Sequence, residues 1–432
     1  MKFVSTTSLT LALALGAVAV TGATPAAAKK KDDAAQAPAA KYSDGFRKVA
    51  PPVQDAIGKK DYATAKAALP AVQAAATTDD DKYAAASFAL QIAQGTNDTA
   101  GVGAAVDAML ATGKAPADLQ VQLYTAQGQN AFNAQKYDVA DRAFSQVNTL
   151  KPNDPDILIS LAAVKSRENQ SPAALQYTDQ AIAAKKATGQ AVDEDWYRRA
   201  LSIAYDGKNP QGVIKYGQQL VEAYPRADIW RIALQTFRDT SHLDPQVDLD
   251  AMRLMRATNS LAGERDYYEY ANTALNKGFP GEAKAVIDQG TSSNMVDNKA
   301  LATSKALAEI KSIAGPKIAA DKADLPNADK RARAGANGNL AFQTADAYLG
   351  YGQYPQAIEL YKIALQKGGA DANLVNLHLG EAQAQSGDKA GAAESLAKVT
   401  GPNQVIAQYW ALYASKGSAP AAPSQPAAAA AR

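Results

Sequence analysis

Few residues of this chain have the types and spacing that chemistry at a site requires. The sequence contains two histidines, His242 and His378, and no cysteine, which excludes thiol chemistry and cysteine-based metal sites. Neither histidine belongs to a metal-binding spacing such as H-E-x-x-H, and no nucleophile elbow or phosphate-binding loop occurs. We expect His378 to be a packed or groove-facing side chain. The sequence thus predicts no catalytic, cofactor-binding or metal-binding residue, and no cofactor.

Two further stretches match ligand sites only in part. The run GVGAAV at Gly101 lacks the third glycine and the preceding strand of a dinucleotide-binding fingerprint, so it predicts a turn that opens a helix. The loop from Asp239 to Asp250 also contains Asp244 and Asp248, but it lacks the glycine and the later glutamate of a calcium-binding loop. We interpret it as a solvated acidic loop, with ion binding as the alternative.

The elements that must position any site are helices in repeated pairs. Residues 121–189 contain two copies of one pattern, in which Ala140 and Ala174 lie 34 positions apart. Small residues in such a pattern let two helices approach closely, and large residues fill the gap to the next pair. Gln127 stands where leucine is usual. The first copy otherwise resembles the tetratricopeptide repeat (TPR) signature, which it meets at Tyr124, Gly128, Ala140, Phe144 and Pro152.

Similar units recur on both sides of this stretch. Gly58, Tyr62 and Ala65 match the turn and second helix of an earlier unit, and Ala357 and Ala392 lie 35 positions apart in the last two. Because a hairpin of this kind cannot bury its apolar face unaided, the units must stack. The resemblance to TPR proteins implies an all-α fold, a right-handed α-solenoid of antiparallel helix hairpins.

The two ends of the chain differ in composition from the repeats. Lys2, the apolar run Leu9 to Val20 and the small residues Ala26 to Ala28 predict a signal peptide over residues 1–28. We expect an exported chain of the bacterial type, in the periplasm, with secretion as the alternative. The remaining predicted boundaries are a flexible linker at 29–41, a TPR-like solenoid with degenerate N-terminal repeats at 42–314, a possible hinge at 315–337, C-terminal TPR repeats with a capping helix at 338–416, and a disordered Ala/Pro tail at 417–432.

The charges of the chain are nearly balanced. It has 45 basic and 43 acidic residues and a net charge of +2, so neither nucleic acid nor an anionic membrane is indicated as a partner. The run Leu9 to Val20 is shorter than the ~20 apolar residues that span a bilayer, and no second run follows. We therefore expect no nucleic-acid partner and no membrane span in the mature chain. A protein or peptide partner is what the resemblance to TPR proteins implies.

The resemblance to TPR proteins also implies a binding surface, the concave groove lined by the first helix of each hairpin. Side chains carried over to this groove begin with Thr125, Gln129, Asn133, Ile159 and Arg167. Tyrosine and arginine, which are enriched in binding hot spots, favour its later section. Ordinary solvated helix faces are the alternative. The lysine and asparagine set with which some TPR members hold a C-terminal carboxylate is absent. The predicted partner-binding groove consists of Tyr197, Tyr205, Arg231, Gln235, Arg238, Tyr268 and Asn272.

These observations predict a non-enzymatic, exported TPR adaptor or scaffold that binds protein segments in its concave groove within the cell envelope. One alternative is a structural subunit of an envelope or secretion assembly. A further alternative is an enzyme, or an enzyme accessory, whose site lies at an inserted segment such as 240–250 or 315–338.

Overall fold

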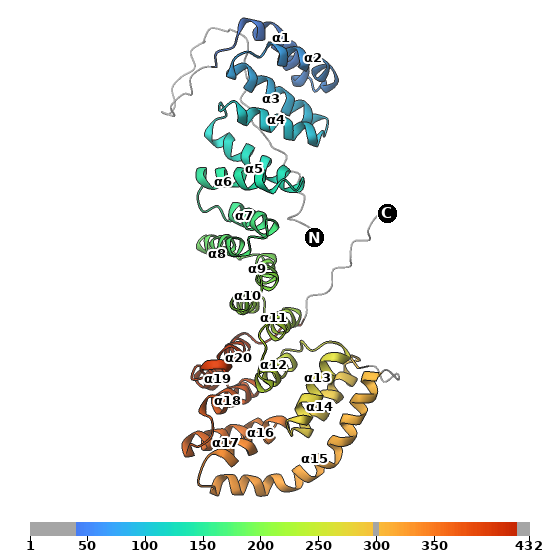
Figure 1. Ribbon diagram of the computed structural model, residues 1–432, viewed down its shortest axis with the longest axis vertical. Helices are drawn as coiled ribbons and strands as arrows, with labels where there is room; N and C mark the ends of the chain where they lie inside the picture. Colours follow the sequence, from blue (N-terminus) through green and yellow to red (C-terminus); the bar gives the residue numbers. More distant parts are fainter. Residues whose placement is uncertain (1–39, 297–301, 421–432) are drawn as a thin grey trace. The chain divides into compact units, whose positions relative to one another are not determined.

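The described part of the chain, residues 40–296 and 302–420 of a computed structural model, is a succession of α-helices (Figure 1). The predicted signal peptide, nearly all of the predicted linker and most of the predicted tail lie outside these residues. Consecutive helices pair as hairpins, which confirms the predicted fold class, an all-α array of the TPR type. Among the described helices, none is long and apolar enough to cross a membrane. The chain divides into two compact units, Met1–Val192 and Asp193–Arg432.

The first unit consists of four helical hairpins in chain order. Each second helix packs on the first helix of the same hairpin, and neighbouring hairpins pack on one another. Its helices are α1 (Asp44–Gly58), α2 (Tyr62–Ala75), α3 (Asp79–Gly95), α4 (Thr99–Ala111), α5 (Ala117–Asn133), α6 (Tyr137–Leu150), α7 (Pro155–Arg167) and α8 (Ser171–Ala187).

The turns inside these hairpins share one backbone feature. A residue with positive φ lies two positions before the second helix, and in the first unit it is never glycine. The left-handed conformation is unfavourable for most residues other than glycine. The packing of the two helices that the turn joins must therefore hold these residues in it. These residues are Lys60 (φ 58°), Asn97 (φ 54°), Gln135 (φ 61°) and Asn169 (φ 60°).

Close contact between helices explains the small residues of the repeat. Gly128 of α5 faces the ring of Phe144 in α6, and a Cβ atom at Gly128 would lie 2.7 Å from that ring. Ala140 and Ala174, the alanines that set the sequence period, are fully buried. The spacing read from the sequence therefore reflects the distance at which neighbouring helices pack.

The second unit begins with hairpins of the same kind and continues through a much longer helix. That helix, α15, contacts α13 and α14 as well as α16 and α17 (Figure 1). The elements of the unit are α9 (Glu194–Asp206), α10 (Pro210–Ala223), α11 (Ala227–Thr240), α12 (Pro245–Ala257), α13 (Gly263–Asn276), α14 (Pro280–Ser292), α15 (Ala302–Ala334), α16 (Asn339–Gly350), α17 (Tyr354–Lys367), α18 (Ala372–Ser386), α19 (Lys389–Leu396), the 3₁₀ turn η1 (Gly401–Asn403) and α20 (Gln404–Lys416).

The segment predicted as a possible hinge, 315–337, is helical as far as Ala334 because it forms the second half of α15. Buried side chains occur near the ends of α15, at Leu307, Ile310 and Ala314 and again at Ala332. The turns between them are exposed or half-buried, which explains why the sequence shows no apolar period there. The hinge itself remains a prediction.

The last helix of the second unit returns to its earlier helices. α20 packs against α10 and α12 as well as α18 and α19. Beyond it, the backbone N–H of Ala419 donates to the carbonyl of Pro225 (2.8 Å), and the N–H of Ala227 donates to the carbonyl of Ala419 (2.9 Å). The predicted capping helix thus covers an internal surface, and the first residues of the predicted tail, 417–420, are held by backbone pairing.

A buried carboxylate fixes the start of the first unit. Asp81, in the first turn of α3, accepts hydrogen bonds from the backbone N–H groups of Ser43 (3.0 Å), Thr77 (3.1 Å) and Thr78 (3.0 Å). Burial by itself raises the pKa of Asp81, but the hydrogen bonds from Thr78 and Ser43 lower it below the ordinary value. The ionised carboxylate therefore joins the segment before α1 to the beginning of α3.

We predict that Asp81→Asn destabilises this region by about 1–3 kcal/mol at pH 7, because the buried side chain loses its charge and one of the two oxygens that accept from these N–H groups. A lowered pKa stabilises the fold above the unfolded value of about 3.9, and this contribution disappears as the pH falls through the folded value. The difference between wild type and variant should therefore hold from pH 7 to about pH 5 and shrink as the pH falls further. Amide hydrogen exchange of α1 and α3 measures this difference in stability. Asp79→Asn, an exposed change in the same turn, is the control, and an equal effect of both variants contradicts the prediction.

Candidate functional site

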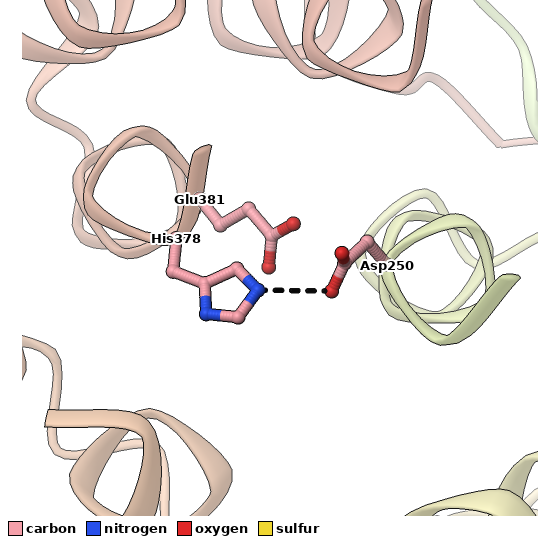
Figure 2. Close-up of side chains that lie close together, drawn as sticks. All are labelled: Asp250, His378 and Glu381. Atoms are coloured by element: carbon pink, nitrogen blue, oxygen red, sulfur yellow. Dashed lines mark ion pairs between the residues drawn. The ribbon is translucent and has the colours of Figure 1, made fainter. Parts of the chain in front are cut away.

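The strongest candidate site is a cluster of buried ionisable side chains in the second unit. Asp250 projects from α12, and His378 and Glu381 project from α18 on the opposite side (Figure 2). Asp250 and Glu381 are fully buried, and His378 is 1% exposed. The spacing of His378 and Glu381 places both on one face of α18. The two helices thus bring an imidazole and two carboxylates together away from water.

His378 is held at both ring nitrogens. Its Nδ1–H donates to Asp346 Oδ1 on α16 (2.7 Å), and the hydroxyl of Tyr361 donates to the same oxygen (2.6 Å). Its Nε2 lies 3.4 Å from Asp250 Oδ1, which is the contact dashed in Figure 2. Burial alone lowers the pKa of His378, but the carboxylates of Asp346 and Asp250 raise it well above the ordinary value.

Arg253 provides the permanent positive charge of the cluster. Its guanidinium donates to both oxygens of Glu282 on α14 (2.9 Å each) and to Asp250 Oδ1 (3.0 Å). The hydroxyl of Tyr270 donates to Glu282 as well (2.7 Å). Burial raises the pKa of Glu282, but Arg253 more than offsets this, so that the pKa lies below its ordinary value. Glu282 and Arg253 form a fully hydrogen-bonded ion pair.

Glu381 is the exception in this cluster. Neither of its carboxylate oxygens has a hydrogen-bond partner, and the nearest cation is Arg253 Nη1, 3.8 Å from Oε2. Asp250 Oδ2 also lacks a partner. Burial, and then the charge of Asp250, raises the pKa of Glu381 well above its ordinary value. Three oxygen atoms therefore lie buried with unused lone pairs.

The cluster could hold a cation more readily than it could catalyse a reaction. One ligand atom from each of Asp250, His378 and Glu381 lies within 4.8 Å of the others, a set that offers one nitrogen and two carboxylates. Because these three side chains are closed to solvent, the structure gives no route for a substrate to reach them.

The sequence predicted that His378 is packed, and the structure confirms its burial. The sequence did not predict the carboxylates that surround His378, because Asp250 and Asp346 belong to other helices. The one available signal was the H-x-x-E spacing of His378 and Glu381, which puts two donors on one helical face.

The prediction of a solvated acidic loop holds for Asp239 and Asp244, which are exposed, and is wrong for Asp250, which is buried. Asp244 caps α12, where its side chain accepts from the backbone N–H of Gln246 (2.8 Å), and Pro245 occupies the first turn. The second half of the stretch is therefore helical. Asp248 pairs with Arg238 (2.6 Å), and Asp250 points into the core.

The predicted groove residues divide into buried, paired and accessible ones. Tyr197 is 2% exposed and belongs to the core, so the expectation that it lies in an open groove is wrong. Arg231 pairs with Asp266, and Arg238 pairs with Asp248 and Glu269 (3.4 Å). These pairs connect α11 to α12 and α13, so the two arginines contribute to packing.

The remaining predicted groove residues are at least partly accessible. Tyr205 is 46% exposed, and Gln235, Tyr268 and Asn272 are half-buried. Gln235 donates to Asp239 (2.9 Å). Ion pairs bring α11 and α13 together, which carry three of these four side chains, whereas Tyr205 lies on α9. The groove as a binding surface remains a prediction.

Comparisons with known proteins give only distant likenesses. No protein-family model and no curated protein matches the chain. Among solved structures, it is similar to the "TPR2AB-domain:pHSP90-complex of yeast Sti1", at 14% identity and a TM-score of 0.25 over 69% of this chain and 100% of that chain. It is also similar to the APC/C hetero-tetramer Cut9-Hcn1 (10%, TM-score 0.23, 84% and 87%) and to Naa15/Naa10 bound to HypK-THB (12%, TM-score 0.20, 81% and 67%).

The buried ion pair of Arg253 generates a stability prediction. Arg253→Met should destabilise the second unit by about 3–5 kcal/mol, because Glu282 and Asp250 would remain as buried carboxylates without their cation. Urea unfolding followed by tryptophan fluorescence reports on this unit, since Trp196, Trp230 and Trp410 all belong to it. The matched control is Arg265→Met, whose side chain is 85% exposed and should cost at most about 1 kcal/mol. Equal effects of both changes would show that the cluster needs no internal cation.

Proposed function

We propose that this chain is a non-enzymatic scaffold that binds protein segments, and that its principal binding surface is an apolar groove in the first unit. The groove has a volume of about 430 Å³ and lies between α2, α3 and α4. This open apolar surface is the observation that carries the proposal, because contiguous apolar hollows on a soluble unit mark sites of interaction.

The groove is built largely from small side chains. Its floor is the face of α3 that carries Ala85, Ala86, Ala89 and Ala93, spaced as one helical stripe. The wall formed by α4 is equally small, with Gly101, Ala104, Ala105 and Ala108, and the wall formed by α2 includes Leu69. Leu69 and Ile92 are the large apolar side chains of the lining, and the small residues around them leave room for large apolar side chains of a partner.

The charges at the groove specify the partner further. Lys66 on α2 and Lys82 on α3 line it, and the acidic side chain among its lining residues, Asp98, already caps α4 by accepting from Gly101 N–H (2.9 Å). Lys66 is exposed. An amphipathic helix, with large apolar residues on one face and acidic residues beside it, complements this surface. We therefore infer a helical, acidic protein segment as the occupant.

The groove predicted from the first helices of the second unit is a weaker proposal. Tyr205, Gln235, Tyr268 and Asn272 could still contact a partner there. Its two arginines are engaged in ion pairs, so they would have to exchange partners on binding. A structural subunit of an envelope or secretion assembly remains the second candidate function, because stacked hairpins serve either role.

We place this scaffold outside the cytoplasm, in the cell envelope. The support is the sequence of residues 1–28, with its basic start, apolar run and small-residue end. Absence of cysteine from the whole chain suits an oxidising compartment, where unpaired thiols would form unwanted disulfides.

A peptide selection tests the groove. Helical peptides selected from a displayed library against the full chain should carry apolar residues at helical spacing with acidic flanks. Ala104→Glu, which places a long anion on the exposed wall of α4, should weaken their binding about tenfold or more, a loss of at least ~1.4 kcal/mol. Ala71→Glu, an exposed change on the opposite face of α2, should leave the affinity unchanged. Fluorescence anisotropy measures both, and equal affinities for both variants would place the site elsewhere.

Export is tested by N-terminal sequencing of the chain recovered from the envelope fraction of the producing cells. We expect the mature chain to begin at or close to Lys29, because signal peptides are cleaved after small residues such as Ala28. A chain that keeps Met1 and stays in the cytoplasm would contradict the proposed location without affecting the groove.

A further inference from the structure

We propose that Asp250, His378 and Glu381 together bind one divalent transition-metal ion of the zinc class, which fastens α12 to α18. The inference goes beyond the scaffold function and depends on a different unit. Its basis is the juxtaposition in Figure 2, in which two helices place one imidazole and two carboxylates around one point in the core.

The donor atoms are close enough for a metal ion after a small contraction. They lie within 4.8 Å of one another. Tetrahedral zinc with bonds of about 2.0–2.2 Å requires ligand atoms about 3.3–3.6 Å apart. Side-chain rotation of Glu381 can close the difference, because neither of its oxygens is held by a hydrogen bond. Asp250 stays anchored through Oδ1, which accepts from Arg253, and its Oδ2 is free to bind the ion.

The unpartnered oxygens themselves point to a missing cation. Buried carboxylates in proteins are paired, hydrogen-bonded or bound to metal. Glu381 is fully buried, and neither of its oxygens accepts a hydrogen bond. Glu282, by contrast, accepts hydrogen bonds from Arg253 and Tyr270. The cluster contains four carboxylates, Asp250, Glu282, Asp346 and Glu381, against one permanent cation. A divalent cation beside Glu381 and Asp250 would offset most of this excess of negative charge.

The surroundings of His378 are those of a metal ligand. Its Nδ1–H donates to Asp346, and Tyr361 fixes that carboxylate from the other side. Such a carboxylate partner orients a metal-binding imidazole and leaves the lone pair of Nε2 for the ion. The Nε2 atom faces Asp250, so the ion would take the place of a proton between them.

A fourth donor is available on α12. The side-chain amide of Gln246 lies 3.1 Å from Asp250 Oδ1 and 3.3 Å from His378 Nε2. A rotation of the amide group by 180° exchanges the positions of its nitrogen and oxygen, and the two orientations of a glutamine or asparagine amide are hard to distinguish. Gln246 Oε1 could then complete a tetrahedral set of one nitrogen and three oxygens.

The chemistry of the site selects the kind of ion and its role. Nitrogen and carboxylate donors without sulfur suit zinc, and also iron or manganese, which bind the same donors more weakly. Calcium prefers six to eight oxygen ligands, more than this set supplies. Because the ligands are closed to solvent, the ion would be structural. It would connect segments that are 132 positions apart in the sequence, as Gln246 and His378 are.

Metal analysis of the full chain, purified without a histidine tag, tests the proposal. After treatment with a chelator, incubation with zinc and removal of free metal, we expect one equivalent of zinc per wild-type chain by mass spectrometry. Cobalt, used as a coloured substitute, should give the visible absorption of a tetrahedral ion. Glu381→Gln keeps the shape of the side chain and removes its charge, and should weaken zinc binding at least about tenfold. Glu394→Gln on neighbouring α19, where the carboxylate is exposed, is the matched control.

A stability measurement keeps the proposal testable if Glu381→Gln folds poorly. Zinc should raise the thermal midpoint of the wild type and of Glu394→Gln, and should leave that of His378→Asn unchanged. The other histidine provides a second control, since His242→Asn should respond to zinc as the wild type does. Less than a tenth of an equivalent in the wild type would overturn the proposal, and so would full zinc binding by both Glu381→Gln and His378→Asn. If the wild type binds no zinc, Glu381 is a buried neutral acid.

Discussion

The stacking of helical hairpins is the constraint on which the rest of this structure depends. A single hairpin leaves one apolar face uncovered, so each is stable only against its neighbours. The positions where backbones approach most closely must then be small, as Gly128 is beneath the ring of Phe144 and as Ala140 and Ala174 are in the core. The same closeness allows turn residues such as Lys60 and Gln135 to stay in a conformation that they would otherwise avoid.

The second unit shows what happens when a stack of this kind returns to its own earlier helices. α15 connects two groups of hairpins, and α20 then covers α10 and α12. The indole N–H of Trp410 donates to the carbonyl of Asp250 (3.2 Å), across 160 positions of sequence. Polar side chains on α12 are thereby shut off from water. Arg253 of α12 is satisfied inside the protein, through the hydrogen bonds that connect it to Glu282 and that Tyr270 extends.

The two candidate sites differ in their access to solvent. In the first unit the groove between α2, α3 and α4 stays open, and its alanine-rich lining has contact surface to offer a partner. In the second unit Asp250, His378 and Glu381 are closed to solvent, so the chemistry there concerns buried charges. A partner segment belongs at the open surface, and an ion that strengthens the fold belongs in the closed one.

The sequence by itself determined the hairpins of this protein, because their signals are local. Small and large residues recur at the helix–helix spacing, and the positions from Tyr124 to Pro152 could be recognised within one repeat. Only the tertiary structure decided which helix faces remained open. Tyr197 has the same residue type as Tyr205, yet one is buried and the other exposed, since burial depends on what packs against each helix. The cluster around Glu381 was hidden for the same reason. Its members come from α12, α14, α16 and α18. The pairing and the pKa of a buried ionisable side chain depend on the charges that folding places beside it, and the sequence of one helix does not contain them.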